Sequence, residues 1–318
     1  MTINNKRGMM VAVVLTTTAA AVVLTILITI LQGQGSRDNV TSTIDSSQLS
    51  YNASEVKRLR VMTTFYPLYE FARSVVGDRA DVDLFIPSGL EPHDWEPSVR
   101  DLERLKGYDL FIYNSSAFEP YVDRLKGLDY NIRMVEAVGG LVVSQDPHVW
   151  LDPLLAKEQV GIILNAIIDM DEANREYYTK NAEAYMLRLD ELHSRFEKEL
   201  SYCDKRMFIT LHAAYNYLAS RYGLKQITIA GIEPEHDIPA GKIMEIVDLA
   251  RRHGIDVVYA EEGVDDRLVR ALAEEMNARV LTLSPIEVLD EDDIKQGKTY
   301  IAKMEENLEN LRLGLGCR

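Results

Sequence analysis

Cysteine is nearly absent from this chain: its 318 residues include only two, Cys203 and Cys317. Neither lies directly after the apolar run of residues 9–31, where a lipid-bearing cysteine would stand. Two cysteines allow at most one disulfide. Pairing them would close a loop of about 114 residues and contribute roughly 4–5 kcal/mol in chain-entropy models. We expect this disulfide in a protein outside the cell; the alternative is two free, buried thiols.

Basic charge is also in deficit, since Lys and Arg number 35 against 50 Asp and Glu, which gives a net charge of −15. This charge argues against nucleic acid as a partner, because phosphates demand a basic surface. It fits an exported protein that handles cations, although acidity that merely keeps the protein soluble explains it equally well. A His-Glu-x-x-His motif is absent too, which argues against a metallohydrolase with its general base inside a ligand motif.

An uncharged, mostly apolar run extends from Met9 to Leu31 and follows Lys6 and Arg7. As a helix it would span roughly 34 Å, enough for a hydrocarbon core of about 30 Å. The run is longer than the roughly 7–15 residues of a signal-peptide core. We therefore expect residues 1–32 to form an uncleaved signal-anchor; cleavage near Gly33–Gly35 is the alternative. The preceding positive charges place everything after the anchor outside the cytoplasm.

Residues 33–57 are polar, and we expect them to form a flexible tether that holds a globular body near the membrane. The N-glycosylation acceptor pattern occurs at Asn39 and Asn52 in this tether and at Asn114 in the body. Hydrophobic residues make up 47% of the chain, which is enough for a substantial core. The length of the body suits two lobes rather than one.

Strand and helix patterns alternate along the body, which predicts an α/β fold with two Rossmann-like lobes and mostly parallel sheets. Between the two sets of strands, residues 172–200 have the long amphipathic pattern of a helix. We expect an N-terminal lobe over residues 58–170, a rigid backbone helix over 171–202 that joins the lobes, and a C-terminal lobe over 203–318. The expected strands are residues 60–65, 82–86, 109–113, 133–136, 207–210, 226–230, 256–260 and 279–283.

Three histidines each lie in a short motif of their own: Glu-Pro-His93-Asp-Trp-Glu-Pro, Asp-Pro-His148-Val-Trp-Leu-Asp-Pro and Leu-His212-Ala-Ala-Tyr. They are 55 and 64 residues apart, so only the tertiary fold can bring them together. Three imidazoles that converge on one point describe a transition-metal site. His93 and His212 follow predicted strands. Ligands of such sheets bind beyond the carboxyl ends of the strands, so we expect the site in the cleft between the lobes.

Together with Thr-Thr-Phe65-Tyr-Pro-Leu-Tyr, Gly-Asp78-Arg and Phe118-Glu-Pro, these motifs resemble the solute-binding proteins of zinc and manganese ABC transporters. The resemblance extends over residues 60–313. It implies two α/β lobes bridged by a long helix, with one metal ion in the cleft, and it matches His93, His148 and His212 to the family's first three ligands. It also implies capture and delivery of the metal to a membrane permease with a cytoplasmic ATPase, with no enzymatic activity. We expect a monomer; an adhesin or sensor of the same fold is an alternative.

Zinc is the expected metal, because imidazole suits Zn²⁺ whereas Mn²⁺ prefers sites richer in carboxylate. Manganese members of the family tend to have a glutamate at the position of His212. The His-rich acidic loop of many zinc members is missing before Asp146, however, so Mn²⁺ remains the alternative. Imidazoles must be neutral to bind a metal, and capture should therefore weaken as the pH falls below about 6.5.

The fourth ligand departs from the family pattern, which often has an aspartate in a Leu-Asp-Pro segment after the last strand. Serine occupies that place here, at Ser284. Glu287, three residues further on, is the expected oxygen ligand; Ser284, Glu262 and a water molecule are alternatives. Asp94 and Glu96 flank His93, and we expect them to orient its ring through hydrogen bonds.

Overall fold

The computed structural model describes residues 57–128, 130–141, 146–231, 239–262, 265–288 and 291–318. The expected signal-anchor (1–32), nearly all of the expected tether (33–57), and the acceptor tripeptides at Asn39 and Asn52 lie outside the described residues. Within the described ranges, none of the helices combines the length and the apolar character that a membrane crossing requires.

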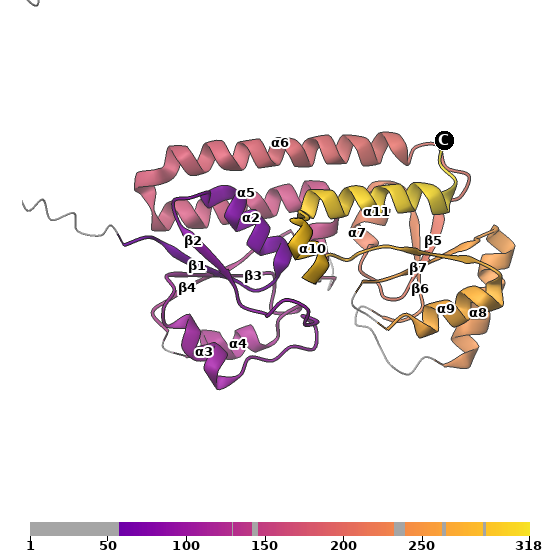
Figure 1. Cartoon of the computed structure of the whole chain (residues 1–318), viewed down its shortest axis with the longest axis horizontal. Coiled ribbons are helices and arrows are strands. Elements are labelled where there is room, and N and C mark those ends of the chain that lie inside the picture. The colour runs from indigo at the N-terminus through magenta and orange to yellow at the C-terminus, as the bar shows by residue number, and fades with distance from the viewer. Residues whose placement is uncertain (1–56, 129, 142–145, 232–238, 263–264, 289–290) are drawn as a thin grey trace, which may run out of the picture. The chain divides into compact units, whose positions relative to one another are not determined.

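The first lobe is built on a four-stranded parallel sheet with the strand order β2-β1-β3-β4. Alternate residues of its strands face opposite sides, so Val61 and Met62 belong to different hydrophobic clusters. Helices α2 and α5 cover one face of the sheet, and α3 and α4 cover the other (Figure 1). The elements are β1 (Arg60–Thr63), α2 (Tyr66–Val76), β2 (Asp81–Leu84), α3 (Val99–Leu105), β3 (Leu110–Tyr113), α4 (Tyr121–Lys126) and β4 (Arg133–Glu136).

The second lobe repeats this arrangement with the strand order β6-β5-β7-β8, again all parallel. Helices α8 and α9 pack on one face, and α11 packs on the other. The elements are β5 (Met207–Thr210), α7 (Asn216–Arg221), β6 (Lys225–Thr228), α8 (Ala240–His253), β7 (Val257–Ala260), α9 (Arg267–Met276), β8 (Arg279–Thr282), α10 (Glu291–Gln296) and α11 (Tyr300–Leu315). All eight predicted strands are present, with ends that agree to within two residues. The predicted two-lobed α/β class is confirmed.

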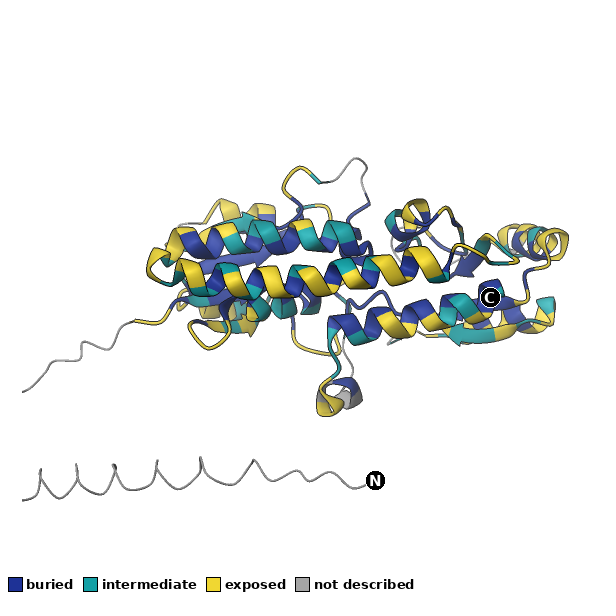
Figure 2. Cartoon of the chain, turned by 90° about the horizontal axis from the view of Figure 1, so that it is seen from above, coloured by how far each residue is buried: buried dark blue, intermediate teal, exposed yellow. Residues whose placement is uncertain are grey.

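Between the sheets the chain forms α5 (Pro153–Met170) and α6 (Arg175–Glu199). Asp152 caps α5, because its carboxylate accepts a hydrogen bond from the Leu154 amide at 3.0 Å and proline follows at the first helical position. Helix α6 packs on α2 and α5 of the first lobe and on α11 of the second. Figure 2 shows its outer face exposed along its length. The predicted long helix is therefore present and spans both lobes.

One hydrophobic cluster extends through both lobes without interruption. It includes Phe65 and Trp150 from the first lobe and Tyr215 and Tyr300 from the second, all almost fully buried. Polar contacts cross the same boundary: the Tyr300 amide donates to the Glu70 carboxylate at 2.5 Å, and the Trp150 indole donates to the Pro285 carbonyl at 2.7 Å. The two lobes therefore share a core and do not merely touch.

The two cysteines, Cys203 and Cys317, are joined in a disulfide that ties the end of α11 to the start of the second lobe. The third glycosylation acceptor, Asn114, is fully buried. Its amide donates to the Pro147 carbonyl at 2.9 Å and accepts from Gln159 at 3.0 Å. A glycosylating enzyme cannot reach this side chain in the folded chain.

Two helical glycines provide a matched test of this packing. A methyl group at Gly314 of α11 would clash with the Tyr259 hydroxyl oxygen, whereas one at Gly161 of α5 would meet only the end of Met186 at 3.6 Å. We expect Gly314→Ala to lower the free energy of unfolding by about 1–3 kcal/mol through overpacking. Gly161→Ala should raise it by about 0.5–1 kcal/mol, because alanine favours the helix. Denaturant unfolding measures both; equal effects would contradict the described packing of α11 on β7.

Candidate metal centre

The three motif histidines and Glu287 meet between the lobes. His93 lies in the loop after β2, and His148 precedes the short 3₁₀ turn Val149–Leu151 that leads into α5. His212 follows β5 and Glu287 follows β8. Each lobe thus contributes two side chains from the carboxyl side of its sheet, the edge where α/β proteins place their ligands. One potential ligand atom from each of the four residues lies within 4.8 Å of all the others.

The distances within this group suit a small tetrahedral ion. Glu287 Oε1 lies 3.7 Å from His93 Nε2, 3.2 Å from His148 Nε2 and 3.8 Å from His212 Nε2. Four ligand atoms bonded to zinc at about 2.1 Å in a tetrahedron would be about 3.4 Å apart. The side chains therefore stand close to the positions that a shared ion requires.

These same four atoms lack hydrogen-bond partners. His93 Nε2, His148 Nε2, His212 Nε2 and Glu287 Oε1 are all buried, and none makes a hydrogen bond within the described part of the chain. A buried polar atom without a partner costs roughly 1–3 kcal/mol, so native proteins rarely keep one. Four of them at one point form a set that a single cation would satisfy at once.

Two carboxylates fix the orientation of the rings. His148 Nδ1 lies 2.7 Å from Asp146 Oδ1, and His212 Nδ1 lies 2.6 Å from Glu261 Oε2. An ionised carboxylate only accepts hydrogen bonds, so Nδ1 carries the ring proton in both cases. The lone pair of the neutral imidazole is then on Nε2, which faces the centre of the group. This pairing of a carboxylate with a histidine is the usual support of a metal-binding imidazole.

The segment before Glu287 is held on several sides. The Trp150 indole bonds to the Pro285 carbonyl, and the Tyr215 hydroxyl bonds to the Leu283 carbonyl at 2.7 Å. Ile286 has a φ of +60°, a conformation that β-branched residues avoid. Such a backbone persists only where the surrounding contacts impose it. Here it turns the chain so that Glu287 lies among the histidines.

The charges in the group are strongly coupled. Burial disfavours the imidazolium of His212, but the carboxylates of Glu261 and Glu287 more than offset this effect and raise its pKa to about 10. Asp146 and Glu287 likewise outweigh burial at His148, whose pKa is raised. Burial would raise the pKa of Glu287, yet the histidines hold it well below its usual range. Without a metal, the group therefore binds protons at neutral pH.

A further carboxyl group adjoins the site. Burial and the nearby charge of Glu287 raise the pKa of Glu91 to about 8. Glu91 also accepts a hydrogen bond from the His93 amide at 3.4 Å. In the metal-free group Glu91 is therefore mostly protonated at neutral pH.

The other expected site residues lie elsewhere. The Ser284 hydroxyl accepts from the Ile286 amide at 3.2 Å, and Glu262 forms an ion pair with Lys303. Asp94 is exposed, and Glu96 pairs with Arg124 on the surface. Of the three protein candidates for the fourth ligand, the structure brings Glu287 alone to the histidines.

Sequence reasoning missed the carboxylates that orient the rings, Asp146 and Glu261. Asp146 stands two residues before His148 in the same Asp-Pro-His motif, which was a usable signal. Glu261 is adjacent to Glu262, and neighbouring residues at the end of a strand point in opposite directions. The sequence alone did not tell which of the two carboxylates faces the site.

Comparison with known proteins agrees with this geometry. The family described as zinc-uptake complex component A, periplasmic, matches residues 61–314. The high-affinity zinc uptake system protein ZnuA of Bacillus subtilis is 36% identical in an alignment of 282 residues, which covers 81% of this chain and 88% of that protein. The zinc-binding lipoprotein AdcA of Streptococcus pneumoniae is 34% identical in an alignment of 277 residues, which covers 80% of this chain but only 55% of the longer AdcA. The solved Zn(II)-bound ZnuA-like domain of AdcA from that organism has a TM-score of 0.74 at 36% identity, covering 81% of this chain and 99% of the domain.

Two adjacent glutamates test the assigned supports. Glu261→Gln replaces the carboxylate that holds His212 and should weaken metal affinity by about 10–100-fold, the usual effect of losing such a partner. Glu262→Gln removes the same charge one residue away but touches Lys303 and no histidine, so it should have a much smaller effect. Calorimetric titration of the full-length variants with Zn²⁺ measures both. Equal losses would mean that general negative charge, and not the contact with His212, governs affinity.

Proposed function

This chain belongs to the family of periplasmic zinc-uptake components, and we propose that it captures one zinc ion outside the cytoplasm and delivers it to a membrane permease. The observation that carries the proposal is the set of four buried, unpartnered ligand atoms on His93, His148, His212 and Glu287. Each is a donor that Zn²⁺ accepts, and three of the four are imidazole nitrogens. In this proposal, His93, His148, His212 and Glu287 are the zinc ligands.

Zinc is favoured over manganese by the composition and size of the site. Mn²⁺ prefers more oxygen ligands and a larger coordination number, whereas three imidazoles and one carboxylate in a tetrahedral arrangement suit Zn²⁺.

The number of protein ligands favours a role in zinc binding over one in catalysis. Catalytic zinc sites keep one coordination position open for water or substrate. Four protein ligands at these separations would complete the tetrahedron and leave no such position. The ion is then cargo, and the protein makes or breaks no covalent bond.

The setting of the site supports a role outside the cytoplasm. A disulfide joins the only two cysteines of the chain, which is typical of oxidising compartments. In this proposal, residues 1–32 anchor the body to the membrane and residues 33–57 tether it. The partner is an ABC-transporter permease with its ATPase in the same membrane, and the protein acts as a monomer.

Metal titration of the full-length protein in detergent tests this function. We expect one Zn²⁺ per chain, bound more tightly than Mn²⁺. His212→Ala and Glu287→Ala should each weaken zinc binding by about 100-fold or more, since losing a direct ligand exceeds the 10–100-fold loss typical of its supports. His253→Ala, a change at the exposed end of α8, should leave affinity unchanged. Equal or tighter Mn²⁺ binding would overturn the choice of metal, and no binding of either ion would overturn the function.

The dependence on pH should differ from the simple expectation of weakening only below about 6.5. Zinc must displace protons from imidazoles whose pKa values are raised, that of His212 to about 10. Apparent affinity should therefore still rise with pH between 6 and 8, by about tenfold per unit for each proton displaced. Zinc titrations at pH 6, 7 and 8 measure this slope. Glu261→Gln, which removes the charge that raises the pKa of His212, should make the slope shallower; a plateau above pH 6.5 would contradict the assigned coupling.

A further inference from the structure

The four candidate ligands are almost inaccessible to solvent. The exposed fraction of their side chains is 5% for His93, 0% for His148, 1% for His212 and 2% for Glu287. An ion that binds at this point needs a defined route from the surface. Buried aromatic rings adjoin the group, and a cavity borders one of its members, Glu287.

Aromatic side chains close one side of the group. The Phe118 ring lies 4.7 Å from the His93 ring, centre to centre, and the Trp150 ring lies 5.1 Å from the His148 ring. Both Phe118 and Trp150 are buried and pack against each other at 5.1 Å. Buried Glu119 fixes the turn that carries Phe118, because it accepts hydrogen bonds from the amides of Asn114 and Ser115. Phe118 and Trp150 both belong to the shared core.

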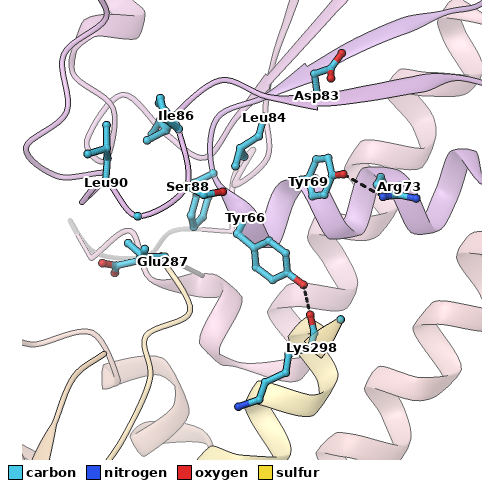
Figure 3. A pocket seen from close by; sticks show the side chains of 15 residues that line it. Tyr66, Tyr69, Arg73, Asp83, Leu84, Ile86, Ser88, Leu90, Glu287 and Lys298 are labelled. Atoms are coloured by element: carbon cyan, nitrogen blue, oxygen red, sulfur yellow. Dashed lines mark hydrogen bonds between the residues drawn. The ribbon is translucent and has the colours of Figure 1, made fainter. Parts of the chain in front are cut away.

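A cavity of about 390 Å³ borders Glu287. It is bounded by the start of α2, by the loop that follows β2 and by the segments at residues 287–288 and 297–298. Figure 3 shows Leu90 and Ile86 on the side of the loop and Glu287 near them, with Arg73 at the opposite end. Of the four candidate ligands, Glu287 is the one that lines this cavity in the described part of the chain.

The cavity walls come from both lobes and are joined to each other. The Tyr66 hydroxyl of α2 donates to the Lys298 carbonyl at 3.1 Å. The Lys298 ammonium is neutralised by Asp293 and Glu306, each at 3.0 Å, so it presents little net positive charge to a passing cation. The opposite wall is the exposed turn from Pro87 to Leu90.

We propose that this cavity is the port through which the zinc ion reaches and leaves the site, with Glu287 as the first ligand that an arriving ion meets and the last that it leaves. The inference rests on the proposed function, because it assigns a route to the same ion. Its distinctive consequence is kinetic. An obstacle in the port slows binding and release by the same factor and leaves the dissociation constant unchanged, since neither end state is altered.

In the test, an introduced cysteine is modified with either a small or a bulky chemical group. Both native cysteines are in the disulfide, so a new thiol is unique. Ser88→Cys and Leu90→Cys place it in the exposed wall of the port, and Ser194→Cys places it on the exposed side of α6 as the control. Each full-length variant is modified in detergent with a methyl or a bulky aromatic thiosulfonate. Stopped-flow mixing with Zn²⁺, and with a chelator, then gives the rates of binding and release.

At Ser88 or Leu90 we expect the bulky group to slow both rates by about tenfold relative to the methyl group, a change of roughly 1.4 kcal/mol in each barrier. At Ser194 the two groups should give the same rates. Binding rates that do not depend on the size of the group at both port positions would overturn the port, even though zinc still bound. Failure of the unmodified protein to bind zinc would instead refute the proposed function.

Discussion

The carboxylate of Glu287 lies buried among three imidazoles, and many contacts of the surrounding structure hold it there. The carbonyls of Leu283 and Pro285 are each held by a buried aromatic side chain. The Asn307 side chain of α11 accepts from the Ser284 amide at 2.8 Å and donates to the Ser284 carbonyl at 2.7 Å. Together these contacts impose the unfavourable backbone of Ile286. The strain is local, and the interactions that offset it lie in the shared core.

That shared core also limits how the lobes can move. Helix α6 packs on helices of both lobes, and Arg221 of α7 bonds to Asp152 at the start of α5 at 2.7 Å. A wide opening of the cleft would expose the buried rings of Trp150 and Tyr300 to water, at about 25 cal/mol for each Å² of apolar surface. Reorientation of the Glu287 side chain alone would leave the hydrogen bonds at Leu283, Ser284 and Pro285 in place. We therefore expect exchange of the ion to involve side chains at the site more than a hinge.

The sequence was sufficient to predict the helices and strands. It was not sufficient to predict which way individual loop side chains point. Strands such as β3 and β5 can be recognised from a short local run of apolar residues, so the eight strands could be located without the structure. The proposed histidine ligands could be identified because each sits in its own distinctive motif. Glu287 could be ranked first but not separated from Ser284 and Glu262, because a positive φ at a β-branched residue is not predicted by any local pattern. Asp94 and Glu96 adjoin His93 in the sequence, yet proximity along a loop does not determine which way a side chain points.

The core that runs through both lobes has a consequence for folding. Neither lobe can bury its share of that cluster alone, since its partners in the cluster lie in the other half of the chain. The body should therefore unfold in one cooperative transition, although its two sheets are topologically separate. A ligand that binds only the folded state then stabilises both halves at once. At a free concentration 100 times its dissociation constant, such an ion adds about 2.7 kcal/mol to the whole body, so metal supply and the lifetime of the folded chain are linked.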